Sequence, residues 1–264
     1  MGPLAMAFDG ANMWVAASHQ TILKIRANDD AVIGTFQVDI RPIALAYDGV
    51  NIWVVGGGSF GVVKMRASDG AILGNFPPGG TLSSVLFDGR DIWVISSTDQ
   101  TLSKLRRLDG AILGTFHVTP SPVAMAFDGG SLWVTDVNAN TVVKVRASDG
   151  MVSETFSVGL LPDAIAFDGR NMWIAEFQGF VTKVGTANGV VLGKFQVLPG
   201  ADGVVFDGAS VWVSAFGDGA VVKLRACDGA HQGNFGVGQN PAGMAFDGAN
   251  VWVANTRSGT ISKL

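Results

Sequence analysis

Residues 122–134 read Pro-Val-Ala-Met-Ala-Phe-Asp-Gly-Gly-Ser-Leu-Trp-Val, and a closely related pattern surrounds every tryptophan in the chain. Successive tryptophans lie 39 or 40 residues apart, and a lysine follows each one after 10 or 11 residues. Self-similarity at a period of this length is the signature of a repeat architecture, here with seven units. The units are centred on Trp14, Trp53, Trp93, Trp133, Trp173, Trp212 and Trp252.

Each unit is expected to contain four short β-strands. In residues 3–8 the large Leu4, Met6 and Phe8 alternate with small alanines, and this period of two is typical of a strand. An Asp-Gly turn leads to a second strand around the tryptophan; a third strand carries the lysine and a fourth a phenylalanine. Helical repeats are excluded, because β-branched and aromatic residues dominate and glycine turns interrupt every segment. The pattern predicts an all-β, seven-bladed β-propeller with four-stranded antiparallel blades.

The whole chain, residues 1–264, is interpreted as one propeller domain that stops within the third strand of the seventh unit. The last blade is therefore expected to have three strands, with its outer strand missing and its edge unpaired. The tryptophans are expected to pack between blades, where the bulky face of one meets the small-residue face of the next. The expected blades are residues 3–41, 42–81, 82–121, 122–161, 162–200, 201–240 and 241–264.

Composition and charge exclude several classes of protein. The chain is 48% apolar and 15% charged, with a mean hydropathy of +0.34 and a net charge of −4. No apolar run reaches the roughly 18 residues of a membrane-spanning helix, so membrane insertion is not expected. The N-terminal residues show no signal peptide. Lys and Arg are dispersed, which argues against a nucleic-acid partner. The single Cys227 excludes an intramolecular disulfide and leaves the compartment unknown.

The repeat unit Pro-x-Ala-x-Ala-Phe-Asp-Gly-x-x-x-Trp-Val resembles the bacterial propellers of the YVTN and virginiamycin B lyase-like (streptogramin lyase-like) superfamily. The resemblance covers essentially the whole chain and implies a seven-bladed fold and a bacterial envelope or secreted location. It also implies that a lyase of this family would use His and Glu residues on the axial face. This chain has only Glu154 and Glu176, and neither matches such a motif. The lyase activity is therefore not carried over.

The repeats differ from one another mainly between the second and third strands. All length variation falls there, because each lysine precedes the next tryptophan by 29 residues throughout. Since strand direction alternates, these loops share one end of the ring, and the Asp-Gly turns and lysines lie toward the other. The aspartates and lysines are expected to pair within blades. Varied loops on a rigid scaffold are typical binding elements.

Four of the 16 phenylalanines fall outside the repeat pattern, and all four lie in the varied loops: Phe60, Phe177, Phe180 and Phe216. Three of them come from neighbouring units, where an exposed apolar patch would mark a binding site. The alternative is that these loops vary because they tolerate change. The candidate ligand-binding residues, which also include polar loop side chains, are Asp136, Glu176, Phe177, Phe180, Phe216, Asp218, Asn255 and Arg257.

The residues that usually carry chemistry do not form a recognisable site. His19, His117 and His231 are dispersed over three units, without the spacing of a metal cluster. Asp136 and Glu176 on neighbouring units are a conceivable acid–base pair, but no nucleophile accompanies them. We expect no metal, no cofactor and no catalytic residue; enzymatic activity is disfavoured and left open.

The favoured function is therefore a non-enzymatic binding or interaction module that presents its varied loops to a peptide, glycan or protein partner. One alternative is a lyase or hydrolase that uses an axial carboxylate, chiefly Glu176. Another is an engineered or recently amplified repeat scaffold without a ligand, which near-verbatim copies such as residues 66–70 and 146–150 favour. We expect a monomer, with a dimer through the open edge of the seventh blade as the alternative.

Overall fold

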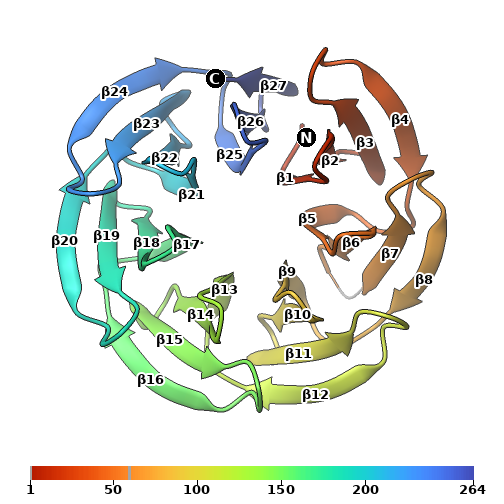
Figure 1. Ribbon diagram of the computed structural model, residues 1–264, viewed down its shortest axis with the longest axis horizontal. Helices are drawn as coiled ribbons and strands as arrows, with labels where there is room; N and C mark the ends of the chain where they lie inside the picture. The colour runs from red at the N-terminus through yellow and green to blue at the C-terminus, as the bar shows by residue number, and fades with distance from the viewer. Residues whose placement is uncertain (1, 59–60) are drawn as a thin grey trace.

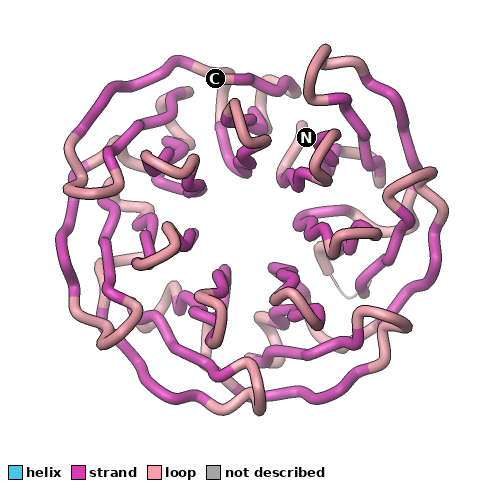
Figure 2. Tube along the Cα trace, in the orientation of Figure 1, coloured by secondary structure: helices cyan, strands magenta, loops and turns pink. Residues whose placement is uncertain are grey.

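The computed structural model describes residues 2–58 and 61–264, which form seven β-sheets arranged as blades around a central axis (Figure 1). Blades 1 to 7 follow chain order. Blades 1 to 6 have four antiparallel strands and blade 7 has three, which confirms the predicted seven-bladed propeller. Figure 2 shows strands and connecting loops throughout the described residues. No helix that could span a membrane occurs in residues 2–58 or 61–264.

Strands occupy equivalent places in successive blades. The first strands, nearest the axis, are β1 (Ala5–Phe8), β5 (Pro42–Tyr47), β9 (Leu82–Phe87), β13 (Pro122–Phe127), β17 (Pro162–Phe167), β21 (Ala201–Phe206) and β25 (Pro241–Phe246). The second strands are β2 (Asn12–Ala17), β6 (Asn51–Gly56), β10 (Asp91–Ser96), β14 (Ser131–Asp136), β18 (Asn171–Glu176), β22 (Ser210–Ala215) and β26 (Val251–Asn255).

The third strands are β3 (Thr21–Arg26), β7 (Val62–Arg66), β11 (Thr101–Arg106), β15 (Thr141–Arg146), β19 (Phe180–Gly185), β23 (Ala220–Arg225) and β27 (Thr260–Lys263). The outer strands are β4 (Val32–Gln37), β8 (Ile72–Phe76), β12 (Ile112–His117), β16 (Val152–Ser157), β20 (Val191–Gln196) and β24 (His231–Gly236). In the described residues blade 7 has three strands, as predicted, and β27 lies at the edge of its sheet.

The Asp-Gly turn fixes the tryptophan within its own blade. In blade 4, Asp128 Oδ1 accepts hydrogen bonds from the backbone N–H groups of Gly130 and Ser131, which closes the turn. Asp128 Oδ2 accepts a 2.8 Å bond from Trp133 Nε1, and all seven blades repeat this indole bond. The aspartate therefore satisfies the polar atom of a buried tryptophan, which would otherwise destabilise the core.

The tryptophans form the core between blades, as expected. Trp133 is fully buried and stacks on Phe156 of its own blade, with ring centroids 5.2 Å apart. Its cluster also includes Ile165, Met172 and Ile174 of blade 5. A bulky indole from one blade thus fills the space beside the small and aliphatic residues of the next, and the hydrophobic cores run from blade to blade around the ring.

The lysines connect neighbouring blades, contrary to the expected pairing with aspartate. Lys144 Nζ lies 5.1 Å from the Trp133 ring centroid and donates a 2.9 Å hydrogen bond to the Thr186 carbonyl of blade 5. The Asp-Gly aspartates are already engaged by the indoles, so the ammonium groups reach across to backbone carbonyls instead. The equivalent inter-blade bonds join Lys24 to Ala67, Lys64 to Arg107, Lys104 to Ala147, Lys183 to Ala226 and Lys263 to Ala27. Lys223 is the exception among the seven repeat lysines of the described chain, because it forms an ion pair with the Asp-Gly aspartate of its own blade, Asp207, at 3.9 Å.

Within residues 2–58 and 61–264, the ring closes between blades 7 and 1 through hydrogen bonds, and no strand crosses the junction. Gly243 N donates to the Leu4 carbonyl at 3.1 Å, which ties β25 to the start of β1. Gly2 N donates to the Thr256 carbonyl at 2.7 Å, and the Thr256 hydroxyl donates to the Pro3 carbonyl at 2.9 Å. These bonds, with the Lys263 bond, hold the two ends of the chain side by side (Figure 1).

Candidate functional site

The varied loops gather at one end of the ring, which we call the loop face. In blades 2 to 7 the loop between the second and the third strand bonds to the connection that enters its blade: Phe177 N donates to the Leu161 carbonyl, and Thr256 N to the Asn240 carbonyl. The turn between third and fourth strands instead bonds to the Asp-Gly turn, as Ala147 N does to the Gly130 carbonyl. The loops and turns therefore lie at opposite ends, as the alternation of strand direction predicts.

Asp136, a predicted binding residue, is a buried anchor of its own loop. Its Oδ1 accepts from the backbone N–H groups of Asn138 and Ala139 at 3.0 and 2.8 Å. Its Oδ2 accepts from Ser121 N at 3.2 Å and from the Thr119 hydroxyl. Burial alone would raise the pKa of Asp136, but these hydrogen bonds outweigh it and lower the pKa. The carboxylate stays ionised and holds the loop against the incoming connection.

Glu176 plays the same part in blade 5. Its side chain is buried, and Oε1 accepts a 2.9 Å bond from Gly159 N and one from the Thr182 hydroxyl. Its Oε2 lies 2.8 Å from Lys194 Nζ, an ion pair with a half-exposed lysine. A Cβ on Gly159 would overlap this carboxylate, so a larger residue there would displace the Glu176 side chain. Asp136 and Glu176 accept hydrogen bonds from different donors. The structure therefore does not favour the two carboxyl groups acting together as an acid–base pair.

Asn255 occupies the corresponding position in blade 7 and is also buried. Its Nδ2 donates to the hydroxyls of Thr260 and Ser262 at 3.2 and 2.9 Å, which closes the loop before β27. Its Oδ1 has no hydrogen-bond partner within residues 2–58 and 61–264. The position three residues after the tryptophan thus holds loop anchors, and none of these three side chains is presented to solvent.

Among the described residues, the exposed large apolar side chains of the loop face lie over blade 5. Phe177 is 43% exposed, and Leu160 and Leu161 in the neighbouring connection are 48% and 37% exposed. We call these three residues the apolar patch. Phe177 N donates a 3.0 Å bond to the Leu161 carbonyl, so the patch is held together by backbone. Leu161 has a φ of +54°, a left-handed conformation that is unfavourable for leucine.

The other aromatic candidates take different positions. Phe216 is linked to the apolar patch through Gly200, whose N–H donates to the Phe177 carbonyl and whose carbonyl accepts from Phe216 N. Phe180 is half-buried at the start of β19, with Lys194 Nζ 4.6 Å from its ring centroid. Phe60 lies outside the described residues. The structure therefore connects Phe177 with Phe216, while Phe180 packs under the lysine that pairs with Glu176.

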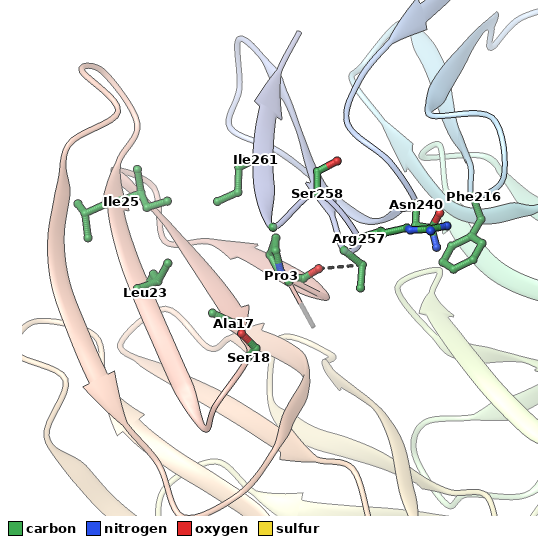
Figure 3. A pocket seen from close by; sticks show the side chains of 14 residues that line it. Pro3, Ala17, Ser18, Leu23, Ile25, Phe216, Asn240, Arg257, Ser258 and Ile261 are labelled. Carbon is green, nitrogen blue, oxygen red and sulfur yellow. Dashed lines mark hydrogen bonds between the residues drawn. The ribbon is translucent and has the colours of Figure 1, made fainter.

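Asp218 and Arg257 line a common cavity of about 400 Å³ between the loops of blades 6 and 7. Arg257 N donates to the Gln239 carbonyl at 3.1 Å, and Gln239 and Asn240 complete the polar wall. Arg257 also borders a second cavity of about 760 Å³, which Phe216 borders too and which extends between blades 7 and 1 (Figure 3). The loops of blades 6 and 7 thus place a negative group, Asp218, and a positive group, Arg257, on the same side of the loop face.

A pair of axial carboxyl groups was not predicted from the sequence. Asp163 and Asp202 occupy the second position of β17 and β21, on first strands of adjacent blades. Burial, together with the hydrogen bond and negative charge of Asp163, raises the pKa of Asp202 to about 8. This shift favours the protonated form of Asp202 at neutral pH, beside the carboxyl group of Asp163. Comparison of the repeats could have identified this pair, because the residues at the equivalent position in other blades include the apolar Ile43, Val123 and Ala242.

Comparisons with known proteins support the fold alone. No family model matches the chain, and no curated protein matches it. Among solved structures, hydrazine synthase of Kuenenia stuttgartiensis superposes with a TM-score of 0.88 at 16% identity, over 100% of this chain and 95% of that chain. A streptogramin B lyase superposes with a TM-score of 0.83 at 18% identity, over 99% and 92% of the respective chains. The expected resemblance to streptogramin lyase-like propellers is thus confirmed at the level of fold.

Proposed function

We propose that this propeller is a non-enzymatic binding module that takes an apolar segment of a protein or peptide partner on the loop face of blades 5 and 6. The observation that carries the proposal is the exposed apolar patch of Phe177, Leu160 and Leu161. Aromatic side chains that lie exposed in the free protein and become buried in a complex are frequent hot spots of binding.

The backbone supports this function. A left-handed leucine costs about 1–2 kcal/mol, and such strain is retained mainly where the surrounding structure imposes it, often at functional sites. Here Leu161 N donates a 2.9 Å hydrogen bond to Asn140 Oδ1, and its carbonyl accepts from Phe177. Loops from blades 4 and 5 thus fix an apolar side chain at the surface, where burial by a partner would return about 25 cal/mol per Å².

Charged groups beside the patch would add specificity. Phe216 lies one backbone link beyond Phe177, and Asp218 and Arg257 follow on the neighbouring loops. An apolar centre with charged groups at its rim matches the usual composition of a protein–protein interface. Asp136 and Glu176 are used as loop anchors, so these two carboxylates are directed to groups of their own chain rather than to a ligand.

Peptide and glycan arrays probed with the labelled protein test the proposal. We expect peptides with apolar centres to bind, and Phe177→Ala to weaken the best one by tenfold or more because the anchor side chain is lost. Leu113→Ala is the matched control, since Leu113 is 46% exposed but lies on β12 away from the loop face.

The melting temperatures of both variants should stay close to that of the wild type. Equal loss of binding in the two variants would contradict the assignment of the site. Binding confined to glycans would overturn the polypeptide partner, and a folded protein that binds neither array would favour the scaffold without a ligand.

A further inference from the structure

The cavity of about 400 Å³ between blades 6 and 7 is separate from the apolar patch, because no patch residue of the described chain lines it. Its walls come from the loop between β22 and β23, the connection between β24 and β25, and the loop between β26 and β27. Pockets for small ligands have volumes of about 300–1,000 Å³. The size of this cavity therefore suits a small molecule.

One acidic and one basic side chain line the cavity. Asp218 lies on the loop of blade 6 and Arg257 on the loop of blade 7, and both residues are exposed. In Figure 3 the Arg257 side chain extends from its loop toward Phe216, which precedes Asp218 by two residues. Within residues 2–58 and 61–264, no ion pair joins the two charged groups, and neither has another side-chain partner. Both charges are therefore available to a ligand.

The sequence sets Arg257 apart from the rest of the loop face. It is the only lysine or arginine in the seven loops between second and third strands, whereas acidic residues occur in several of them. A positive and a negative side chain thus meet on neighbouring loops at a single place on this face. The cavity lies between them.

Backbone and side-chain bonds hold both charged loops against the same connection. Val237 N donates to the Gly219 carbonyl of the blade 6 loop at 2.8 Å. On the other side, Arg257 N donates to the Gln239 carbonyl at 3.1 Å, and Gln239 N donates to the Ser258 hydroxyl at 2.6 Å. The cavity walls are therefore fixed before a ligand arrives, which lowers the entropy lost on binding.

The connection adds neutral polar groups to the cavity wall. Gln239 and Asn240 both line it, and amide side chains offer donors as well as acceptors. The Asn240 carbonyl accepts from Thr256 N at 2.9 Å, which fixes this residue to the loop of blade 7. Val237 is the one large apolar residue that lines the cavity in the described chain. The wall therefore matches a polar ligand, in contrast to the apolar patch.

A ligand with one charge would leave either Asp218 or Arg257 without a counter-charge. An α-amino acid carries an ammonium group and a carboxylate on one carbon atom, so it can satisfy both side chains together. The planar guanidinium of arginine donates paired hydrogen bonds to a carboxylate, and an aspartate accepts from an ammonium group. The amides of Gln239 and Asn240 then remain for the ligand's own side chain.

We propose that the cavity between blades 6 and 7 binds a free α-amino acid with a small polar side chain, with its carboxylate on Arg257 and its ammonium group on Asp218. This ligand is additional to the polypeptide of the proposed function, whose anchor Phe177 does not line the cavity.

Isothermal titration calorimetry with free amino acids tests the proposal. The panel contains serine, asparagine, glutamine, leucine and phenylalanine, each titrated at millimolar concentration into the wild type. We expect the polar members to bind more tightly than leucine and phenylalanine. The N-acetyl and α-carboxamide forms of the best ligand should bind at least tenfold more weakly, because each lacks one of the two charges.

Two variants assign each charge to its partner. Asp218→Asn should weaken binding of the free amino acid at least tenfold but hardly change that of its N-acetyl form, which has no ammonium group. Arg257→Gln should likewise weaken the free amino acid but hardly change the α-carboxamide form. Asp99→Asn is the matched control, since Asp99 is an exposed aspartate on the corresponding loop of blade 3 and should be dispensable.

The proposal is overturned if no member of the panel binds the wild type, or if leucine or phenylalanine binds most tightly. It is also overturned if a blocked form binds as tightly as the free amino acid, or if Asp99→Asn weakens binding as much as Asp218→Asn. These titrations contain no polypeptide ligand, so their failure would leave the proposed function of the apolar patch unaffected.

Discussion

Replacement of Lys144 by methionine would measure the contribution of the inter-blade lysine bond to stability. Methionine keeps most of the aliphatic length but removes the ammonium group, which donates a 2.9 Å bond to the Thr186 carbonyl. A hydrogen bond from a charged donor contributes about 1.5–3 kcal/mol. The contact of the ammonium with the Trp133 ring, at 5.1 Å, adds about 0.5–1 kcal/mol. We expect a total loss of about 2–4 kcal/mol.

Lys223 supplies a matched control within the same chain. Its Nζ lies 4.4 Å from the Trp212 ring centroid, so the cation–π contact is present. The described residues contain no inter-blade carbonyl bond from this lysine; its ion pair with Asp207, at 3.9 Å, is long. Lys223→Met should therefore cost only about 0.5–1 kcal/mol.

Thermal denaturation followed by circular dichroism compares the two variants. For a chain of this size, 1 kcal/mol shifts the melting temperature by about 2–4 °C. Lys144→Met should therefore melt several degrees below Lys223→Met. Equal losses in the two variants would refute the reasoning, because they would mean that the contact with the indole, and not the bond to the next blade, provides the stability.

Three other positions are expected to respond measurably to pH or to substitution. The pKa of Asp202 is raised to about 8 in the folded protein, so the folded protein retains a proton that the unfolded chain loses near pH 4. The stability gained from this proton is complete below about pH 4 and is lost as the pH rises to about 8. The melting temperature of the wild type should therefore fall relative to Asp202→Asn between about pH 4 and pH 8. Glu176→Gln should lower stability by about 1–3 kcal/mol in urea denaturation, because the Lys194 ion pair is lost. Gly150→Ala should cost about 2–4 kcal/mol, since its φ is +73° and the new methyl group overlaps Phe116; thermal melting checks this.

The blades could be predicted from sequence because every unit repeats the same local signals. The tryptophan and the Asp-Gly turn lie five residues apart, so one short stretch contains both the core residue and its turn. The missing outer strand of blade 7 also followed from this count, since the chain ends one strand before the pattern does. Regular spacing, alternation of side-chain size and turn residues all agreed, which is the condition for a reliable prediction of fold.

The roles of individual side chains could be predicted less well. The Lys144 ammonium bonds to a carbonyl 42 residues away, and no pattern in the sequence indicates that partner. Asp136 and Glu176 were selected for their charge, but the structure encloses both. Their neighbour Phe177 is exposed. Burial depends on how each loop meets the connection of the preceding blade, and this is a tertiary property.

Two informative exceptions were present in the sequence all the same. Asp163 and Asp202 are acidic residues at a position where other repeats have mainly apolar ones, and Asp30 stands where other repeats have glycine or end. Comparison of each position across all repeats would have found them, because a departure from a repeated residue is informative even without relatives.

The ring is joined unequally around its circumference. Between successive blades from 1 to 7 the polypeptide passes covalently from an outer strand to the next first strand, whereas in the described residues blades 7 and 1 are connected by noncovalent bonds and packing. In a repeat array, stability depends on contacts with nearest neighbours, so fraying spreads from the weakest junction. On heating, the contacts between blades 7 and 1 should therefore be lost first, and the contacts between blades 3 and 4, on the opposite side of the ring, should be lost last.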